Sequence, residues 1–210
     1  MDEYLSEQEQ WELVKKWLRE NTVWLLAGVL IAVAGISAYR WYQARVEKQL
    51  LVAGTIYEQL AQAADKRDQG TVDKLLAQLQ SEHAGTGYAD HAQLVAARLY
   101  LESNQQSKAV ETLQKLLTVT KDPQLALAAR LRVARIQIDQ AKADDALTTL
   151  QAVGAAGAFA ARYAEVRGDA LLAKGKRDEA LKAYQEALGA NDQAVDSEVL
   201  KLKIADLSRS

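Results

Sequence analysis

Residues 161–192 read ARYAEVRGDALLAKGKRDEALKAYQEALGAND, and this stretch decides the fold. Small residues and one aromatic residue recur in it at helical spacing. Two antiparallel helices approach closely only where small residues meet, and a large residue on the second helix fills the space beside them. The stretch therefore predicts a helical hairpin. The residues that carry the pattern are Gly168, Leu171, Gly175, Ala180, Tyr184 and Ala187.

The same pattern occurs twice more towards the N-terminus. One copy lies 34 residues earlier, which is the period of tetratricopeptide (TPR) repeats, and the next lies a further 37 residues back. The matching residues are Ala134, Gln137, Ala141, Ala146, Leu150 and Val153 in the middle copy and Ala97, Tyr100, Asn104, Ala109, Leu113 and Leu116 in the first. We therefore expect an all-α fold: a TPR-like α-solenoid of helix pairs over residues 90–210, with a C-terminal capping helix at 193–208.

Helix-breaking residues agree with this division. Pro123 suits the first turn of a helix, where its missing N–H would be unpaired anyway. Gly168 lies inside a helix, where close contact with a neighbouring helix is the expected reason for it. Asn104 and Gly175 fall in the turns between paired helices, where a left-handed backbone is often needed. The Trp and Pro typical of TPR repeats are missing, so the repeats are described as TPR-like.

The region between the repeats and the N-terminal segment also looks helical. Residues 41–89 predict a helical linker and a degenerate first helix pair, with a long helix over 41–66 and a shorter one over 71–82. The segment AGTGYAD at 84–90 contains two glycines, and we expect a flexible hinge there.

Residues 21–39 (NTVWLLAGVLIAVAGISAY) form the one long uncharged run of the chain. At a rise of about 1.5 Å per residue the run spans roughly 28 Å, close to the thickness of the hydrocarbon core of a bilayer. Rings of tryptophan and tyrosine, which prefer the headgroup layer, gather at its two ends. These aromatic residues are Trp17, Trp24, Tyr39, Trp41 and Tyr42. We expect a transmembrane helix over 21–40, in contact with membrane lipid, after an N-terminal segment of residues 1–20.

Two alternatives to a retained anchor are a buried core helix and a cleaved signal peptide. A signal peptide begins with a short basic segment, whereas residues 1–20 carry six acidic and three basic residues. Cleavage after the small triplet Ala32-Val33-Ala34 would also cut the run in its middle. A retained anchor is therefore favoured.

The charges leave the orientation of this anchor open. Three basic residues lie near each end of the run, so the rule that basic residues stay in the cytoplasm decides nothing. The basic residues are Lys15, Lys16 and Arg19 before the run and Arg40, Arg45 and Lys48 after it. A chain without cysteine fits an exported domain, and it fits many cytosolic domains equally well.

Composition and motifs exclude several classes of function. A net charge of −2 without a basic stripe makes nucleic acid an unfavourable partner. There is no cysteine nucleophile, and His83 and His91 fit no metal-binding spacing. Gly85-Thr86-Gly87 is too short for a phosphate-binding loop. We expect no enzyme, no metal and no cofactor.

Stacked helix pairs form a curved surface, and the first helix of each pair lines its inner face. On this face apolar and charged residues are mixed, which suits a groove that holds a peptide or a partner helix. Single positions could instead be ordinary solvated or inter-repeat residues. The predicted groove residues are His91, Leu94, Arg98 and Leu101 in the first pair, Leu131, Arg135 and Ile138 in the second, and Glu165, Asp169 and Leu172 in the third.

The membrane helix carries a second candidate contact surface. Gly28, Ala32 and Gly35 are spaced four and three apart, so they give the helix one face of small residues. Such faces let helices pack closely in lipid, although glycine and alanine are common in membrane helices for other reasons.

Five stretches also match a known family over essentially the whole chain. They are WELVKKWLREN before the run, AYRWYQ at 38–43, Ile56-Tyr57, LRVARIQIDQAKADDAL at 131–147 and EVRGDALLAKGKRDEA at 165–180. In these residues the chain resembles the YfgM family, the ancillary subunits of the bacterial SecYEG translocon. The last two stretches are long and more specific than general TPR-like repeats.

The resemblance implies an inner-membrane protein of a Gram-negative bacterium, with a cytoplasmic N-terminus and a periplasmic TPR-like domain. It also implies association with the SecYEG translocon and with the membrane-anchored periplasmic chaperone PpiD. The expected function is a scaffold or co-chaperone that helps newly exported client proteins reach periplasmic chaperones, without enzymatic activity. The groove residues above come from the repeat register and not from the resemblance.

A different class of function stays open. The chain could be a regulatory adaptor of an envelope stress response, acting through the cytoplasmic segment 1–20. Leu13, Trp17 and Leu18 could give that segment an apolar face for a partner, or let it lie on the membrane surface. Assembly of a cell-wall or outer-membrane machine also uses such domains, and only the family resemblance argues against it.

Overall fold

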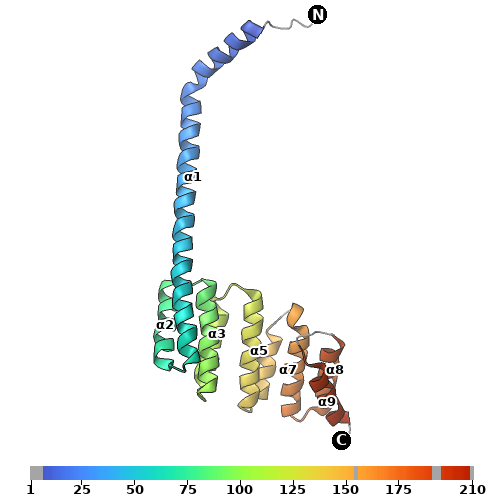
Figure 1. The fold of residues 1–210 in the computed structure, drawn as a ribbon. Coiled ribbons are helices and arrows are strands. Elements are labelled where there is room, and N and C mark those ends of the chain that lie inside the picture. Colours follow the sequence, from blue (N-terminus) through green and yellow to red (C-terminus); the bar gives the residue numbers. More distant parts are fainter. Residues whose placement is uncertain (1–6, 154–155, 191–194, 209–210) are drawn as a thin grey trace, which may run out of the picture. The chain divides into compact units, whose positions relative to one another are not determined.

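The computed structural model describes residues 7–153, 156–190 and 195–208. It divides the chain into two units, Met1–Leu51 and Val52–Ser210. All regular structure in the described residues is helical, which confirms the all-α prediction (Figure 1). The helices are α1 (Glu7–Asp65), α2 (Gln69–Glu82), α3 (Gly87–Glu102), α4 (Gln106–Val119), α5 (Pro123–Asp139), α6 (Ala143–Gln151), the short 3-10 helix η1 (Gly157–Phe159), α7 (Ala160–Ala173), α8 (Arg177–Gly189) and α9 (Ser197–Ser208).

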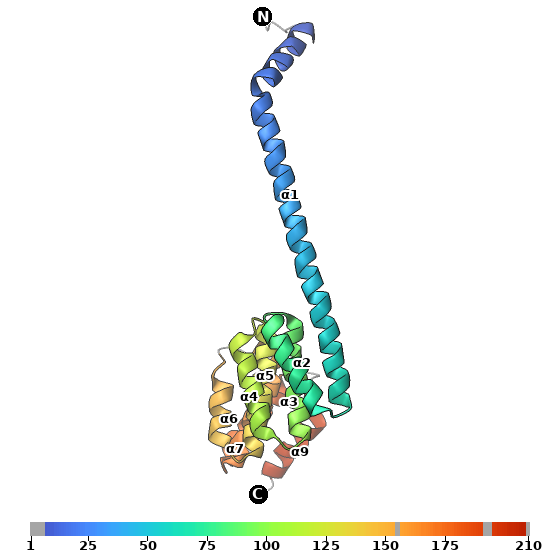
Figure 2. The same cartoon turned by 90° about the vertical axis from the view of Figure 1, so that its left-hand side faces the viewer.

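The second unit is a stack of helical hairpins. Its helices follow one another in chain order in Figure 1, and Figure 2 views the stack from the end where α2 lies. α3 pairs with α4, α5 with α6, and α7 with α8, as the three copies of the sequence pattern predict. The last helix, α9, packs against α8. It begins at Ser197, and residues 193–194 of the predicted capping helix lie outside the described residues.

Each hairpin has a residue with a left-handed backbone at the same position of its turn. The backbone angle φ is 58° at Asn104, 60° at Ala141 and 76° at Gly175, the three positions that the repeat alignment places in one slot. In each turn the N–H of the next residue donates to a carbonyl five residues earlier, for example Lys142 to Gln137 at 2.8 Å. This bond satisfies a carbonyl group at the end of the first helix.

A fourth turn of the same kind lies 37 residues before Asn104. Arg67, between α1 and α2, has a φ of 57°, and Asp68 N–H donates to the Ala63 carbonyl at 2.9 Å. The last part of α1 and α2 therefore form a hairpin with the same turn. The side chain of Asp68 also caps α2 by accepting a hydrogen bond from Thr71 N–H at 3.1 Å.

The close approach predicted at Gly168 is present between α7 and α8. A Cβ atom on Gly168 would lie 2.5 Å from Cε1 and 2.6 Å from Cδ1 of Tyr184. Tyr184 is fully buried, and its hydroxyl donates to the carboxylate of Asp169 at 2.7 Å. The sequence expectation that a small residue meets an aromatic one is confirmed at this pair.

The core of the second unit is continuous along the stack. Buried residues of α1 to α5 form one cluster, those of α5 to α7 a second, and those of α7 to α9 a third. Tyr100 is 2% exposed and keeps its hydroxyl paired by donating to Asp73, which Lys108 also contacts at 2.7 Å. Burial raises the pKa of the Asp73 carboxyl, but the hydrogen bonds from Lys108 and Tyr100 outweigh it, so that this pKa lies below its ordinary value.

The connection between α2 and α3 is shorter than the hinge expected at 84–90. α3 already begins at Gly87, because the Thr86 side chain accepts a hydrogen bond from Ala89 N–H and caps the helix. The Thr86 hydroxyl also donates to the His83 carbonyl at 2.8 Å, and Gly85 has a φ of 79°. These contacts make a defined turn where two glycines suggested a flexible one.

The first unit contains the apolar run. Among the described residues one helix is long and apolar enough to cross a membrane, with a mean hydropathy of 2.0 over its most apolar window and none of that window buried. At the start of the run, the side chains of Asn21 and Thr22 donate to carbonyl groups one turn earlier in the same helix. Both side chains therefore place a donor on a carbonyl group of their own helix, which lowers the cost of exposing them to lipid. Residues 1–6 of the predicted N-terminal segment lie outside the described residues.

Candidate partner-binding groove

The second unit contains a cavity of about 450 Å³ whose main wall is helix α3. All four residues predicted for the first helix pair, His91, Leu94, Arg98 and Leu101, line it. They come together because their spacing of three and four residues keeps them on one face of the helix. The other lining residues are Tyr57 from α1, Val95 and Ala97 from α3, Leu113 from α4 and Arg132 from α5. We call this cavity the α3 groove.

Packing of α3 fixes the direction of this face. Ala92 and Ala96 are fully buried and Leu99 is 2% exposed, so the small residues of α3 meet the neighbouring helices. His91 and Arg98 stay exposed at the edge of the groove, whereas Leu94 and Leu101 are partly buried against the core. The groove therefore has an apolar floor and a polar rim, the usual composition of a recognition site.

The second helix pair does not continue the groove as the register predicted. Leu131 is only 4% exposed and packs in the core with Val166 and Ala170 of α7, so it is not a surface residue. Ile138 is partly buried against the same cluster. The reason is that α5 packs directly against α7 on this side. Arg135 is exposed as expected.

In the third helix pair the two predicted acidic residues form ion pairs with a lysine of α9. Lys203 Nζ lies 3.2 Å from the Glu165 carboxylate and 2.7 Å from the Asp169 carboxylate. Desolvation lowers the pKa of the Lys203 amine, but the two carboxylates outweigh it and raise this pKa above its ordinary value. Glu165 and Asp169 are therefore part of an ion-pair network that docks the last helix, whereas Leu172 stays exposed at 37%.

Sequence reasoning missed Arg132 and Tyr57 as lining residues. Arg132 lies 37 residues after Val95, which also lines the groove, so the repeat offset relates the two. Extending the predicted face of α5 by one position would have found it. The ring of Tyr57 packs against that of Tyr88 at a tilt of 43°, with ring centres 5.9 Å apart, a contact between α1 and α3 that the sequence does not reveal.

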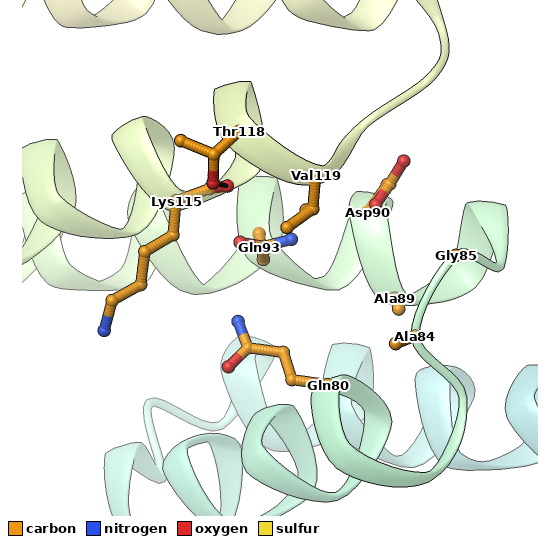
Figure 3. A pocket seen from close by; sticks show the side chains of 9 residues that line it. All are labelled: Gln80, Ala84, Gly85, Ala89, Asp90, Gln93, Lys115, Thr118 and Val119. Carbon is orange, nitrogen blue, oxygen red and sulfur yellow. Dashed lines mark hydrogen bonds between the residues drawn. The ribbon is translucent and has the colours of Figure 1, made fainter.

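A second, smaller cavity of about 230 Å³ was not predicted (Figure 3). It lies where α2 and α4 end and α3 begins, and Gln80 and Gln93 face each other across it in Figure 3. Gln93 is 2% exposed, and its Oε1 atom has no hydrogen-bond partner among the described residues. The remaining lining residues are Ala84, Gly85, Ala89, Asp90, Lys115, Thr118 and Val119.

The predicted small-residue face of the apolar run is not covered by other described residues of the first unit. Apart from the adjacent residues and the nearby backbone of the same helix, no described heavy atom lies within 4 Å of a Cβ built on Gly28 or Gly35, and Ala32 is exposed. The face is thus open to another helix, and its role in helix packing stays a prediction.

Comparison with known proteins extends these observations. The family described as tetratricopeptide repeat-like domain matches residues 15–209. The ancillary SecYEG translocon subunit of Escherichia coli is 31% identical, over 99% of this chain and 100% of that protein. The protein of the same name from Neisseria gonorrhoeae is 29% identical, over 99% of this chain and 100% of its own length.

A solved structure shares the fold at low sequence identity. The crystal structure of a kinesin light chain-type protein of Podospora anserina, with nearly identical TPR-like repeats, has a TM-score of 0.54 and 18% identity. The match covers 79% of this chain and 86% of that one. The fold and the names of the relatives point to a non-catalytic role in protein interaction. By its full-length similarity, the chain belongs to the family of ancillary SecYEG translocon subunits.

Proposed function

We propose that this protein is an inner-membrane ancillary subunit of the SecYEG translocon whose TPR-like body is a periplasmic scaffold and co-chaperone. In this role it binds the chaperone PpiD and assists the transfer of newly exported proteins to periplasmic chaperones. The observation that carries the proposal is the similarity to the E. coli ancillary SecYEG translocon subunit, which extends over that protein's whole length. The similarity to a protein named for the translocon therefore covers both the apolar run and the TPR-like body.

The α3 groove supports a scaffold function. It is open, with an apolar floor of leucine side chains and a rim of exposed polar residues. Such surfaces bind extended peptides or amphipathic helices. A groove next to the translocon would meet either a partner protein or an emerging client chain.

Association with the translocon can be tested by co-purification of SecYEG with the full-length protein from detergent-solubilised membranes. Leu101→Gln alters the floor of the groove, and Leu202→Gln, at a residue 71% exposed on α9, is the matched control. We expect the wild-type protein to retain SecYEG and Leu101→Gln to lose PpiD or client proteins, while Leu202→Gln behaves as wild type. Absence of SecYEG from the wild-type preparation would overturn the proposal.

The proposed orientation has its own test, which uses the absence of cysteine from the chain. Single cysteines replace Gln8 in the N-terminal segment and Lys121 in the exposed connection between α4 and α5. A membrane-impermeant maleimide should label the Lys121→Cys protein in cells with a permeabilised outer membrane, and the Gln8→Cys protein only after the inner membrane is opened. The reverse pattern would place the TPR-like body in the cytoplasm.

One observation favours the regulatory adaptor as a second candidate. Leu13, Trp17 and Leu18 are 55%, 56% and 45% exposed on α1, so that an apolar surface is available before the membrane run. Replacement of Leu13, Trp17 and Leu18 by serine separates the two functions. A scaffold keeps its translocon contact without these apolar side chains, whereas an adaptor loses its effect on the envelope stress response.

A further inference from the structure

The α3 groove joins an apolar floor to a cluster of positive charge. Leu94 and Leu101 line the cavity together with Arg98 and Arg132. Arg135 follows Arg132 by three residues on α5, so both project from the same side of that helix. At about 450 Å³ the cavity has the size of sites that hold several ligand groups.

The three arginines differ in their acidic partners. Arg98 lies 3.2 Å from the Asp65 carboxylate and 3.7 Å from that of Glu102. Arg135 is 4.0 Å from Glu165, whose carboxylate is already bound by Lys203.

Arg132 has no acidic group within ion-pair distance among the described residues, and its charged neighbours are Arg135 and Arg98. Desolvation, and then repulsion from these two arginines, lowers the pKa of the Arg132 guanidinium. Arg132 is exposed, so water solvates its charge in the free protein, but no carboxylate of the described residues neutralises it.

A carboxylate placed at Arg132 would remove this imbalance. Guanidinium groups bind carboxylates through two parallel hydrogen bonds, and arginine and aromatic anchors such as Tyr57 dominate the energetics of protein interfaces. Glutamate and aspartate thus complement Arg132 at the rim of the groove, whereas a basic segment would be repelled by Arg132, whose charge no carboxylate of the described residues neutralises. Leucine-sized side chains complement the floor.

We propose that the α3 groove binds an acidic and apolar segment of a partner protein, which inserts a large apolar side chain between Leu94 and Leu101 and places a carboxylate on Arg132. Both features line one cavity, so the two residues of the partner lie close together. This inference rests on the proposed function, because it names the chemistry of the segment that the scaffold holds.

The test uses the full-length protein in phosphatidylcholine nanodiscs and two matched pools of peptides of about 12 residues, long enough for three helical turns. Both pools have leucine at one fixed position and Ala, Ser and Gly elsewhere. One pool also contains Asp and Glu, and the other contains Asn and Gln in their place. Arg132→Gln removes the unpaired cation. Arg130→Gln makes the same charge change two residues away on another face of α5 and does not touch the groove.

We expect the protein to retain the acidic pool about tenfold or more above the amide pool, and Arg132→Gln to abolish that preference, as truncation of one partner of a charge pair does. Arg130→Gln should keep it. Equal retention of the two pools, no retention of either, or an unchanged preference in Arg132→Gln would overturn the proposal.

Binding of phosphatidylglycerol vesicles that depends on Arg132, without a preference between the pools, would assign the groove to a lipid headgroup instead. Co-purification of SecYEG tests the proposed function separately from the peptide pools. If only the peptide inference is wrong, SecYEG still co-purifies with the wild-type protein and with Arg132→Gln. Loss of SecYEG from the wild-type protein is the failure of the proposed function itself.

Discussion

Replacement of Gly168 by Ala tests the packing on which the repeat fold depends. The new methyl group would lie 2.5 and 2.6 Å from two ring carbons of Tyr184. The ring is fully buried and its hydroxyl is held by Asp169, so it cannot move aside. Overpacking of this kind costs about 1–3 kcal/mol, and occasionally more. Alanine regains about 1 kcal/mol over glycine in a helix interior. Two contacts this short place the overpacking cost at the upper end of the range, about 3 kcal/mol, so we expect a net loss of about 2 kcal/mol in the free energy of unfolding.

The assay is urea unfolding of the full-length protein in detergent micelles, followed by far-ultraviolet circular dichroism. Tryptophan fluorescence is unsuitable, because all four tryptophans lie in residues 1–51. Gly189→Ala is the matched control: Gly189 is the last residue of α8, and a Cβ there has no heavy atom within 4 Å. This change should leave stability equal or slightly higher.

A double mutant sharpens the result, since Tyr184→Leu removes the ring and should reduce the cost of Gly168→Ala. If Gly168→Ala is as stable as wild type, or if its cost is the same without the ring, the close-packing argument is wrong.

Three further predictions concern the turns, the hydrogen-bonded carboxylate of Asp73 and the last helix. Residues 141 and 175 both have positive φ, which glycine adopts more readily than alanine. Ala141→Gly should therefore stabilise the protein by about 0.5–1 kcal/mol, and Gly175→Ala should destabilise it by about 1 kcal/mol. Urea unfolding that shows a loss of stability for Ala141→Gly or a gain for Gly175→Ala would refute this. The pKa of Asp73 is lowered by folding, so its contribution is present above its unfolded pKa of 3.8 and is lost as the pH falls through the folded value. The difference in urea midpoint between wild type and Asp73→Asn should therefore shrink below that pH, and a constant difference would contradict the proposed role of the carboxylate. Lys203→Gln leaves Glu165 and Asp169 facing each other, and should cost about 1–2 kcal/mol; hydrogen exchange of α9 should accelerate, and unchanged exchange would refute its docking role.

The parts of the fold that follow from local sequence were predictable. Small residues at Gly168, Ala134 and Ala97 recur at the TPR period, and their spacing gives the hairpins and their turns without any structure. The run at 21–39 can likewise be recognised as a candidate membrane-spanning helix from its length and its lack of charged residues. In each case a pattern within one or two helices carries the information.

The groove was predictable only in part, because it depends on contacts between helices far apart in sequence. The four residues of α3 share one helix face, and the structure brings them together. Leu131 fits the same spacing, yet α7 packs over it and removes it from the surface. The carboxylates of Glu165 and Asp169 accept hydrogen bonds from Lys203, which lies more than 30 residues later in the chain. No spacing within α5 or α7 reveals these partners.

The helix boundaries show the same limit at a smaller scale. Two glycines at 84–90 suggested a hinge, but the Thr86 cap and its bond to His83 define a turn instead. Thr86 is a capping residue type, so that signal was present in the sequence and was outweighed by the glycines.

Site-specific photo-crosslinking from Leu101 in living cells tests the central claim most directly. A photoreactive residue replaces Leu101 on the floor of the α3 groove, Leu202 on α9 provides the control position, and the adducts are identified by mass spectrometry. The account predicts that Leu101, and not Leu202, forms adducts with translocon subunits, PpiD or exported chains. Adducts with cytoplasmic proteins alone, or the same adducts from both positions, would contradict the claim that this groove serves protein export at the translocon.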